Sequence, residues 1–260
     1  MRRRRLLRQK RRRMRRMKVY LLRASVLALG CVLLILPFRL EGCGSGYFAN
    51  KHGVADETAM KRLLGMWQKK KVYEPPEYQE ELLTYNEYSR VGEILPQVKN
   101  IFVHYTANPG TTAMQNRNYF ENLKTSHTTS ASAHFIIGID GEIVQCIPLT
   151  EVAYAVAGRN YDSVSIECCH PGEDGKFSDA TYQSLVHLTA WLISAYDLDV
   201  KDVLRHYDEN GKLCPKYYVE HEDAWEQFHA DVSAYIEQCG MTEAERKEIE
   251  KKDGQVDHME

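Results

Sequence analysis

The sequence predicts a single α/β domain with a central mixed β-sheet flanked by helices, preceded by an N-terminal transmembrane helix. Three observations lead to this prediction. Between residues 97 and 240, short apolar runs typical of buried strands alternate with amphipathic helical patterns. A basic segment followed by an apolar segment opens the chain. Roughly 200 residues remain after these segments, which is enough for one domain with a buried core.

The N-terminal segment has the pattern of a membrane anchor. Residues 1–18 are rich in arginine and lysine, and residues 19–40 form an apolar run of 22 residues with Arg23 and Arg39 near its ends. Such a run is long enough to cross a bilayer as a helix. Positive charge before a span keeps that side in the cytoplasm. An uncleaved anchor in the cell membrane and a cleaved signal segment both fit, and both place the domain outside the cytoplasm.

Charge is unevenly distributed along the chain. The first 18 residues hold 12 of the 34 lysines and arginines and none of the 36 acids, which leaves a net charge of −14 for the rest. Because an acidic body repels phosphates, we expect no nucleic-acid partner. The seven cysteines are irregularly spaced in a chain that is not small, which argues against a disulfide scaffold. Cys168 and Cys169 are adjacent, so in a strand they would point to opposite faces as small buried side chains.

Residues 41–96 form a polar connector between the apolar segment and the domain, which covers residues 97–240. Residues 57–70 have the apolar spacing of a short amphipathic helix, and Pro75-Pro76 ends this pattern. The sequence leaves open whether the connector packs on the domain or acts as a spacer.

The predicted strands are apolar runs bounded by turn residues. They cover residues 101–104, 133–139, 142–147, 152–156, 163–169 and 203–207, of which 152–156 has the weakest pattern. Asp140-Gly141 lies between the second and third runs, and this dipeptide suits a two-residue primed turn. The sequence therefore predicts a β-hairpin there.

The predicted helices carry apolar side chains at helical spacing. The first covers residues 112–124 with Tyr119, Phe120 and Leu123 facing inward, and the second covers 180–196 after a cap at Ser178 or Asp179. The third covers 222–237, and its apolar face is Trp225, Phe228, Val232 and Ile236. Residues 241–260 are highly charged and are predicted to form a loose tail.

Histidine and cysteine near the end of the last predicted strand indicate a metal site. His206 is followed eight residues later by Cys214, across a short polar turn. Imidazole nitrogen and thiolate sulfur are ligands that Zn²⁺ prefers, and His104 at the end of the first strand is a candidate third ligand. Three protein ligands would leave one position open, as in a catalytic zinc site. The alternatives are a structural His104 and a Cys214 that is a buried thiol or a disulfide partner of Cys239.

Glu167 lies in an apolar strand, where a carboxylate is costly unless it is paired or near a cation. It is either an outward-facing edge residue or, next to a metal, a proton acceptor. His134 is either a satisfied core histidine or a residue that faces substrate. The remaining candidates lack partners in their sequence context and are predicted to be solvated: His170, His187, His221 and His229.

Taken together, these segments resemble a known family, the zinc-dependent N-acetylmuramoyl-L-alanine amidases of type 2. This family is related to peptidoglycan recognition proteins and phage lysozyme-amidases. The resemblance covers about residues 97–230, and its motifs occur in the family's order. The matching segments are FVHYT at 102–106, SAHFII at 132–137, DGEIVQ at 140–145, SIE at 165–167, RHY at 205–207, Lys212 and Cys214-Pro215.

The resemblance implies that His104, His206 and Cys214 bind Zn²⁺. One branch of the family has a tyrosine before the hairpin histidine, where this chain has Ala133. The other branch uses a glutamate in the position of Glu167 as the general base, and Lys212 matches the family's lysine near the last ligand. The implied activity is hydrolysis of the amide between N-acetylmuramic acid and L-alanine in peptidoglycan. The alternative is a peptidoglycan-binding protein without catalysis.

Overall fold

The structure is a computed structural model that describes residues 69–256. The predicted basic segment 1–18, the predicted transmembrane segment 19–40 and nearly all of the predicted helix 57–70 lie outside these residues. Within residues 69–256, no helix is both long enough and apolar enough to cross a bilayer.

A mixed sheet flanked by helices forms the centre of the domain, as the sequence predicted. It has six strands in the order β1-β4-β3-β5-β2-β6, and β1 lies in the segment that the sequence predicted to be a connector. The strands are β1 (Gln79–Glu80), β2 (Asn100–Tyr105), β3 (Phe135–Ile137), β4 (Ile143–Gln145), β5 (Ser163–Cys168) and β6 (Val203–Arg205). Only β3 and β4 pair antiparallel, while β3, β5, β2 and β6 run parallel to one another. The carboxyl ends of these four strands therefore lie at one edge of the sheet.

The β3–β4 hairpin has a longer turn than predicted. Gly138 donates its N–H to the Glu142 carbonyl at 2.8 Å, and the Gly138 carbonyl accepts from Gly141 at 3.1 Å. The loop thus has three residues rather than two. Gly141 has φ +87°, a conformation that glycine adopts without a steric penalty and that suits the last position of such a loop.

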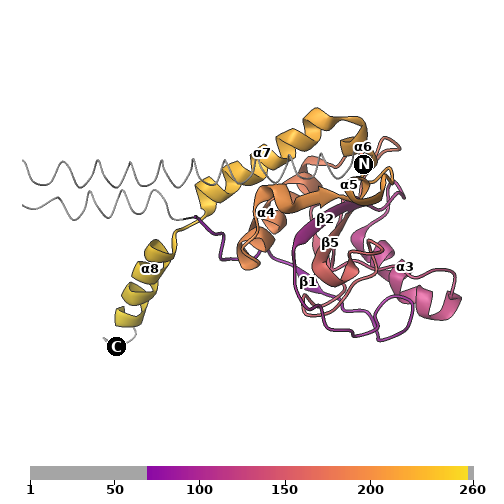
Figure 1. The fold of residues 1–260 in the computed structure, drawn as a ribbon, viewed down its shortest axis with the longest axis horizontal. Coiled ribbons are helices and arrows are strands. Elements are labelled where there is room, and N and C mark those ends of the chain that lie inside the picture. The colour runs from indigo at the N-terminus through magenta and orange to yellow at the C-terminus, as the bar shows by residue number, and fades with distance from the viewer. Residues whose placement is uncertain (1–68, 257–260) are drawn as a thin grey trace, which may run out of the picture. The chain divides into compact units, whose positions relative to one another are not determined.

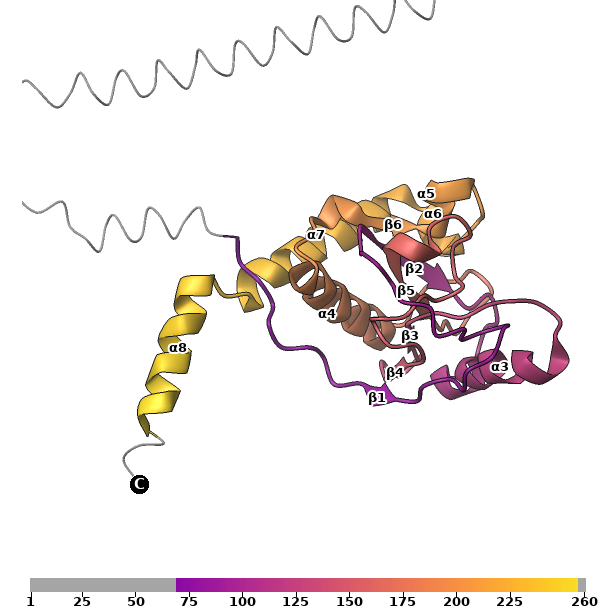
Figure 2. The same cartoon turned by 60° about the horizontal axis from the view of Figure 1, so that its bottom comes forward.

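Helices cover both faces of the sheet (Figures 1 and 2). Helices α4 (Asp179–Ala195), with Ser178 as its cap, and α7 (Glu222–Cys239) pack on the face that carries Ile101 and Val103. Helix α3 (Ala113–Ser126) packs on the other face, against β3 and β4. Because α3 lies at the β3–β4 end of the sheet, it does not cover the part of this face over β5 and β2 (Figure 2).

Several predicted elements differ in the structure. Tyr119 of α3 is 51% exposed, so it does not face inward. Residues 152–156 form no strand, and the last strand is shorter than predicted because helix α5 (His206–Asn210) begins directly after Arg205. Helix α6 (Lys216–Glu220) follows. The predicted loose tail contains helix α8 (Glu243–Val256). Cys168 and Cys169 do lie in the apolar clusters on opposite faces, as predicted.

Residues 69–95, here called the strap, pack along the domain, which decides for this part of the connector the question that the sequence left open. Strand β1 pairs with β4, and Val72 and Leu83 are buried in the two apolar clusters. The Arg90 guanidinium donates two hydrogen bonds of 2.8 Å to the Glu151 carboxylate. These contacts make the strap an integral part of the folded unit.

Candidate metal centre

His104, His206 and Cys214 come together at the carboxyl edge of the sheet. His104 is near the end of β2, and His206 begins α5 directly after β6, the parallel neighbour of β2. The Nδ1 atoms of the two histidines are 3.1 Å apart, and Cys214 Sγ lies 3.7 Å from His104 Nδ1. All three side chains are buried, and their donor atoms lie within 4.8 Å of one another.

The 3.1 Å and 3.7 Å separations are close to those around a tetrahedral zinc ion. Zinc–nitrogen and zinc–sulfur bonds of standard length put neighbouring donors roughly 3.3–3.6 Å apart. Burial lowers the pKa of His104, as do the charges of His206 and Lys212, so its imidazole is neutral as a metal ligand requires. Burial raises the pKa of the Cys214 thiol to about 12, with Glu167 adding to this and Tyr105 and Lys212 opposing it. Two imidazoles and one sulfur are a donor set that suits zinc.

The turn between His206 and Cys214 is held by local hydrogen bonds. Gly211 ends α5 with φ 79°, and the Tyr207 N–H donates to the Cys214 carbonyl at 3.0 Å. Asn210 Oδ1 accepts from the backbone N–H of Lys212 at 3.0 Å. These bonds return the chain to the sheet edge, so that Cys214 reaches the histidines.

Glu167 pairs with His104 in the ladder between β5 and β2, so both side chains lie on the same face of the sheet. Its Oε2 atom is buried and has no hydrogen-bond partner among the described residues. Burial raises the pKa of the Glu167 carboxyl to about 8, against the opposing charge of Lys212. The sequence alternative of an outward-facing edge residue is therefore wrong.

Lys212 is exposed, yet its charge reaches the whole cluster. It lowers the pKa of His104, His206, Glu167 and Cys214. An ammonium group close to the buried donors can stabilise negative charge that develops beside them.

The comparisons with known proteins agree with this arrangement. Residues 95–217 match the family model described as N-acetylmuramoyl-L-alanine amidase. These residues therefore belong to the type 2 amidase family.

Two curated relatives and two solved structures illustrate the similarity of this amidase domain. It is 32% identical over 164 residues to N-acetylmuramoyl-L-alanine amidase CwlL of Bacillus licheniformis, covering 58% of this chain and 45% of that protein. It is 32% identical over 180 residues to N-acetylmuramoyl-L-alanine amidase BlyA of Bacillus subtilis (strain 168), covering 61% of this chain and 47% of that protein. The chain thus spans about half the length of these relatives.

The solved structures match the amidase domain over nearly their whole length. The catalytic domain of XlyA has a TM-score of 0.51 at 28% identity, covering 60% of this chain and 99% of that chain. A mutant endolysin from Bacillus subtilis has a TM-score of 0.50 at 28% identity, covering 60% of this chain and 98% of that chain.

Other candidate side chains of the amidase domain have structural roles. His134 is buried, accepts from the Ser165 N–H at 3.1 Å and lies 3.0 Å from the Glu151 carbonyl, so it is a satisfied core histidine. His170 is 1% exposed, which contradicts the prediction that it is solvated, and its Nδ1 lies 2.7 Å from the Gly172 carbonyl. Cys214 and Cys239 are both free thiols, so the alternative disulfide is absent.

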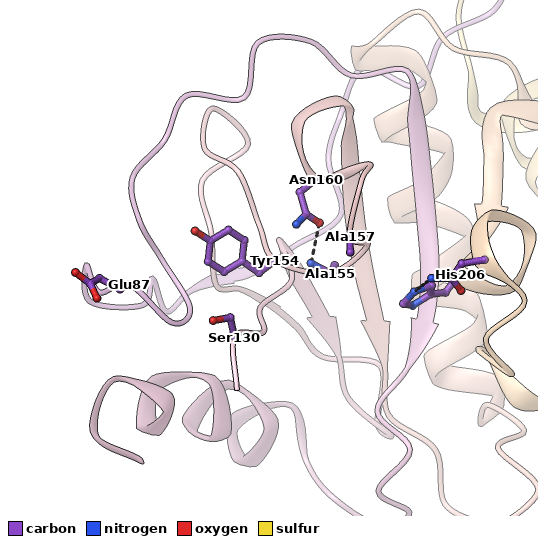
Figure 3. A pocket seen from close by; sticks show the side chains of 8 residues that line it. Glu87, Ser130, Tyr154, Ala155, Ala157, Asn160 and His206 are labelled. Atoms are coloured by element: carbon purple, nitrogen blue, oxygen red, sulfur yellow. Dashed lines mark hydrogen bonds between the residues drawn. The ribbon is translucent and has the colours of Figure 1, made fainter. Parts of the chain in front are cut away.

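Sequence reasoning missed a groove that opens beside His206 (Figure 3). Tyr154 lines it from the segment 152–156 that the sequence suggested as a weak strand, Asn160 lines it from just after that segment, and Glu87 lines it from the strap. Nothing in the local sequence marks these side chains, because only the folding of distant segments brings them together.

Proposed function

We propose that this chain is a zinc-dependent amidase that hydrolyses the bond between N-acetylmuramic acid and L-alanine in peptidoglycan. The observation that carries the proposal is that the donor atoms of His104, His206 and Cys214 lie close together, with Glu167 paired to His104 in the sheet. Family membership and the names of the curated relatives support the substrate and the bond.

The donor set would hold Zn²⁺ through His104 Nδ1, His206 Nδ1 and Cys214 Sγ. When bound, the ion supplies Lewis-acid polarisation of the scissile carbonyl and makes water a better nucleophile at neutral pH. Glu167 is the proton carrier. A cation held beside it would lower the pKa of its carboxyl group. The ionised carboxylate takes a proton from the attacking water and returns that proton to the leaving L-alanine nitrogen.

Lys212 completes the proposed machinery. Attack on the amide carbonyl places negative charge on the carbonyl oxygen, and an ammonium group nearby lowers the energy of that state. The long, exposed side chain of Lys212 can reach this oxygen from the turn that precedes Cys214. The products are the lactyl acid of the glycan and a free peptide.

A peptidoglycan-binding protein without catalysis is the alternative function. The complete donor set, with a buried carboxylate and a lysine beside it, favours catalysis. The test combines zinc analysis of the purified chain with mass analysis of muropeptides after digestion. A three-ligand site should hold about one zinc per chain. Cleavage at the proposed bond should release peptides that begin with L-alanine. Binding to peptidoglycan without any cleavage would leave only the alternative.

We also propose that the domain acts outside the cytoplasm, tethered to the cell membrane by residues 19–40 or released after cleavage there. The support is the basic and apolar pattern of the sequence alone. Mass analysis of the N-terminus of the protein from cells distinguishes an intact anchor from a cleaved one. Labelling by a reagent that cannot cross the membrane tests the location, and protection of the domain from it would refute the proposal.

A further inference from the structure

A groove of about 420 Å³ extends from His206 to the strap. Figure 3 shows Glu87 and His206 at opposite ends of the labelled residues, with Ser130, Tyr154, Ala157 and Asn160 between them. Three of the lining side chains, those of Ser130, Ala155 and Ala157, are small, which leaves room for an extended ligand. The groove therefore connects the candidate metal centre with a residue that lies outside the segment matched by the family, residues 95–217.

Polar groups in this groove have unused hydrogen-bonding capacity. Asn160 Oδ1 accepts from the backbone N–H groups of Ala155 at 3.1 Å and Val156 at 2.8 Å, which fixes its amide. Within residues 69–256, the Asn160 Nδ2 group, the Tyr154 hydroxyl and the Glu87 carboxylate have no hydrogen-bond partner. The Asn160 amide is held in place while its Nδ2 hydrogens remain free, so it can donate hydrogen bonds to the backbone carbonyls of a ligand.

Hydrogen bonds within a turn hold the backbone that carries Glu87. Asn86 Oδ1 accepts from the N–H groups of Tyr88 at 2.8 Å and Ser89 at 2.9 Å, and the Asn86 N–H donates to the Arg90 carbonyl at 2.7 Å. This closed turn places Glu87 at its tip. A side chain on a fixed turn loses less freedom on binding than one on a loose loop.

Side chains tie the same turn to the domain. Tyr88 stacks on His127 with ring centroids 4.4 Å apart and an interplanar angle of 10°. The Tyr88 carbonyl accepts from Ala131 at 3.0 Å, and Arg90 donates to the Leu83 carbonyl at 2.7 Å. The position of Glu87 is therefore set by contacts on both sides of it in the chain.

Glu87 is the one acidic side chain among the residues that line the groove. We propose that the groove holds the peptide part of the substrate and that the Glu87 carboxylate pairs with an ammonium group on that peptide. This inference rests on the proposed amidase function, because it takes the peptide to extend from the cleaved bond. The N-acetylated glycan carries no ammonium group, whereas a stem peptide with a diamino acid does. Glu87 is thus a specificity residue that favours a free side-chain amine.

The test uses two muramoyl tripeptides that end in lysine, identical except that the lysine side chain is free in one and N-acetylated in the other. Acetylation removes the charge and keeps the length nearly unchanged. The full-length chain in detergent should show a KM about fivefold lower for the free amine, with similar kcat, as expected for an exposed ion pair. Glu87→Gln should abolish this preference, and Glu87→Lys should reverse it.

Glu77→Gln is the matched control, since Glu77 is an exposed strap glutamate that does not line the groove. It should keep the wild-type preference. Direct binding of both tripeptides to the Glu167→Gln chain separates recognition from cleavage. A preference seen in binding but no hydrolysis by wild type would support the groove and refute the amidase activity. Equal affinity of wild type for the two ligands, or a preference that survives in Glu87→Gln, would overturn the inference.

Discussion

Glu167 lies directly opposite His104 in the parallel ladder between β5 and β2. Neighbouring strands are about 4.8 Å apart, and side chains at paired positions share a face. The carboxylate is therefore held beside a candidate metal ligand by backbone hydrogen bonds rather than by a flexible loop. This geometry makes the relative position of the proton carrier and the metal site a property of the sheet itself.

Replacing Glu167 by glutamine tests its proposed role. The glutamine has nearly the same size but cannot accept a proton, so hydrolysis of muropeptides should fall at least about 100-fold. Zinc content measured by mass spectrometry should stay at the wild-type value, because Glu167 is not in the donor set. Glu173→Gln, at an exposed loop position, is the control and should remain active. Full activity of Glu167→Gln would refute the role.

Cys214 and Cys239 form a matched pair for testing the metal site. Cys214→Ser removes a buried sulfur donor and should lower zinc affinity strongly, with loss of hydrolysis. Cys239→Ser changes an exposed thiol on α7 and should leave zinc content and hydrolysis unchanged. Removal of zinc by a chelator should abolish activity, and added Zn²⁺ should restore it. Retention of stoichiometric zinc by Cys214→Ser would exclude the thiol as a ligand.

Lys212→Gln should reduce kcat about tenfold to hundredfold, because it removes positive charge near the developing oxyanion. KM should change much less. Lys216→Gln provides the comparison, since the Lys216 ammonium donates to the Glu173 carbonyl at 2.8 Å and lies outside the donor cluster. Equal kcat values for the two variants would show that Lys212 has no specific role.

His134 should make the fold sensitive to acid. Burial lowers its pKa to about 4, partly offset by Glu151, whereas the unfolded side chain titrates near 6.5. Between these values the unfolded state binds more protons than the folded state, so stability falls as pH drops. From pH 7 to pH 5 the free energy of unfolding should fall by about 2 kcal/mol through this residue. Urea unfolding should show a smaller loss over this range in His134→Gln, and an unchanged loss would exclude His134 as the source.

The ion pair between Arg90 and Glu151 should hold the strap in place. Its side chains are only 10% and 13% exposed, and the contact is bidentate. Arg90→Met leaves a largely buried carboxylate unpaired and should lower the free energy of unfolding by about 2 kcal/mol. In the double variant with Glu151→Met, part of that loss should be recovered. Additive losses in urea unfolding would show that the two residues do not stabilise each other.

Local patterns in the sequence predicted most of the sheet and the helices of the amidase domain. The apolar runs at 101–104 and 163–169 became β2 and β5, and the helical spacing after Ser178 became α4. The predictions failed where tertiary contacts overrode local preference. Residues 152–156 are apolar but form no strand, and instead line the groove and fill the core beneath it. His170 has a polar sequence context but is buried, with its ring centroid 5.2 Å from that of Tyr105.

The sequence by itself determined most of the strands and helices and their succession along the chain. It also identified His104, Glu167, His206, Lys212 and Cys214 as candidates, because side-chain chemistry and hydrophobic period are local properties. Only the tertiary structure decided that His104 and His206, 102 positions apart, place their Nδ1 atoms 3.1 Å from each other. It also decided that the strap joins the sheet and brings Glu87 to the groove. Pairing between β1 and β4 and burial of strap side chains depend on surfaces that exist only after the rest of the chain has folded.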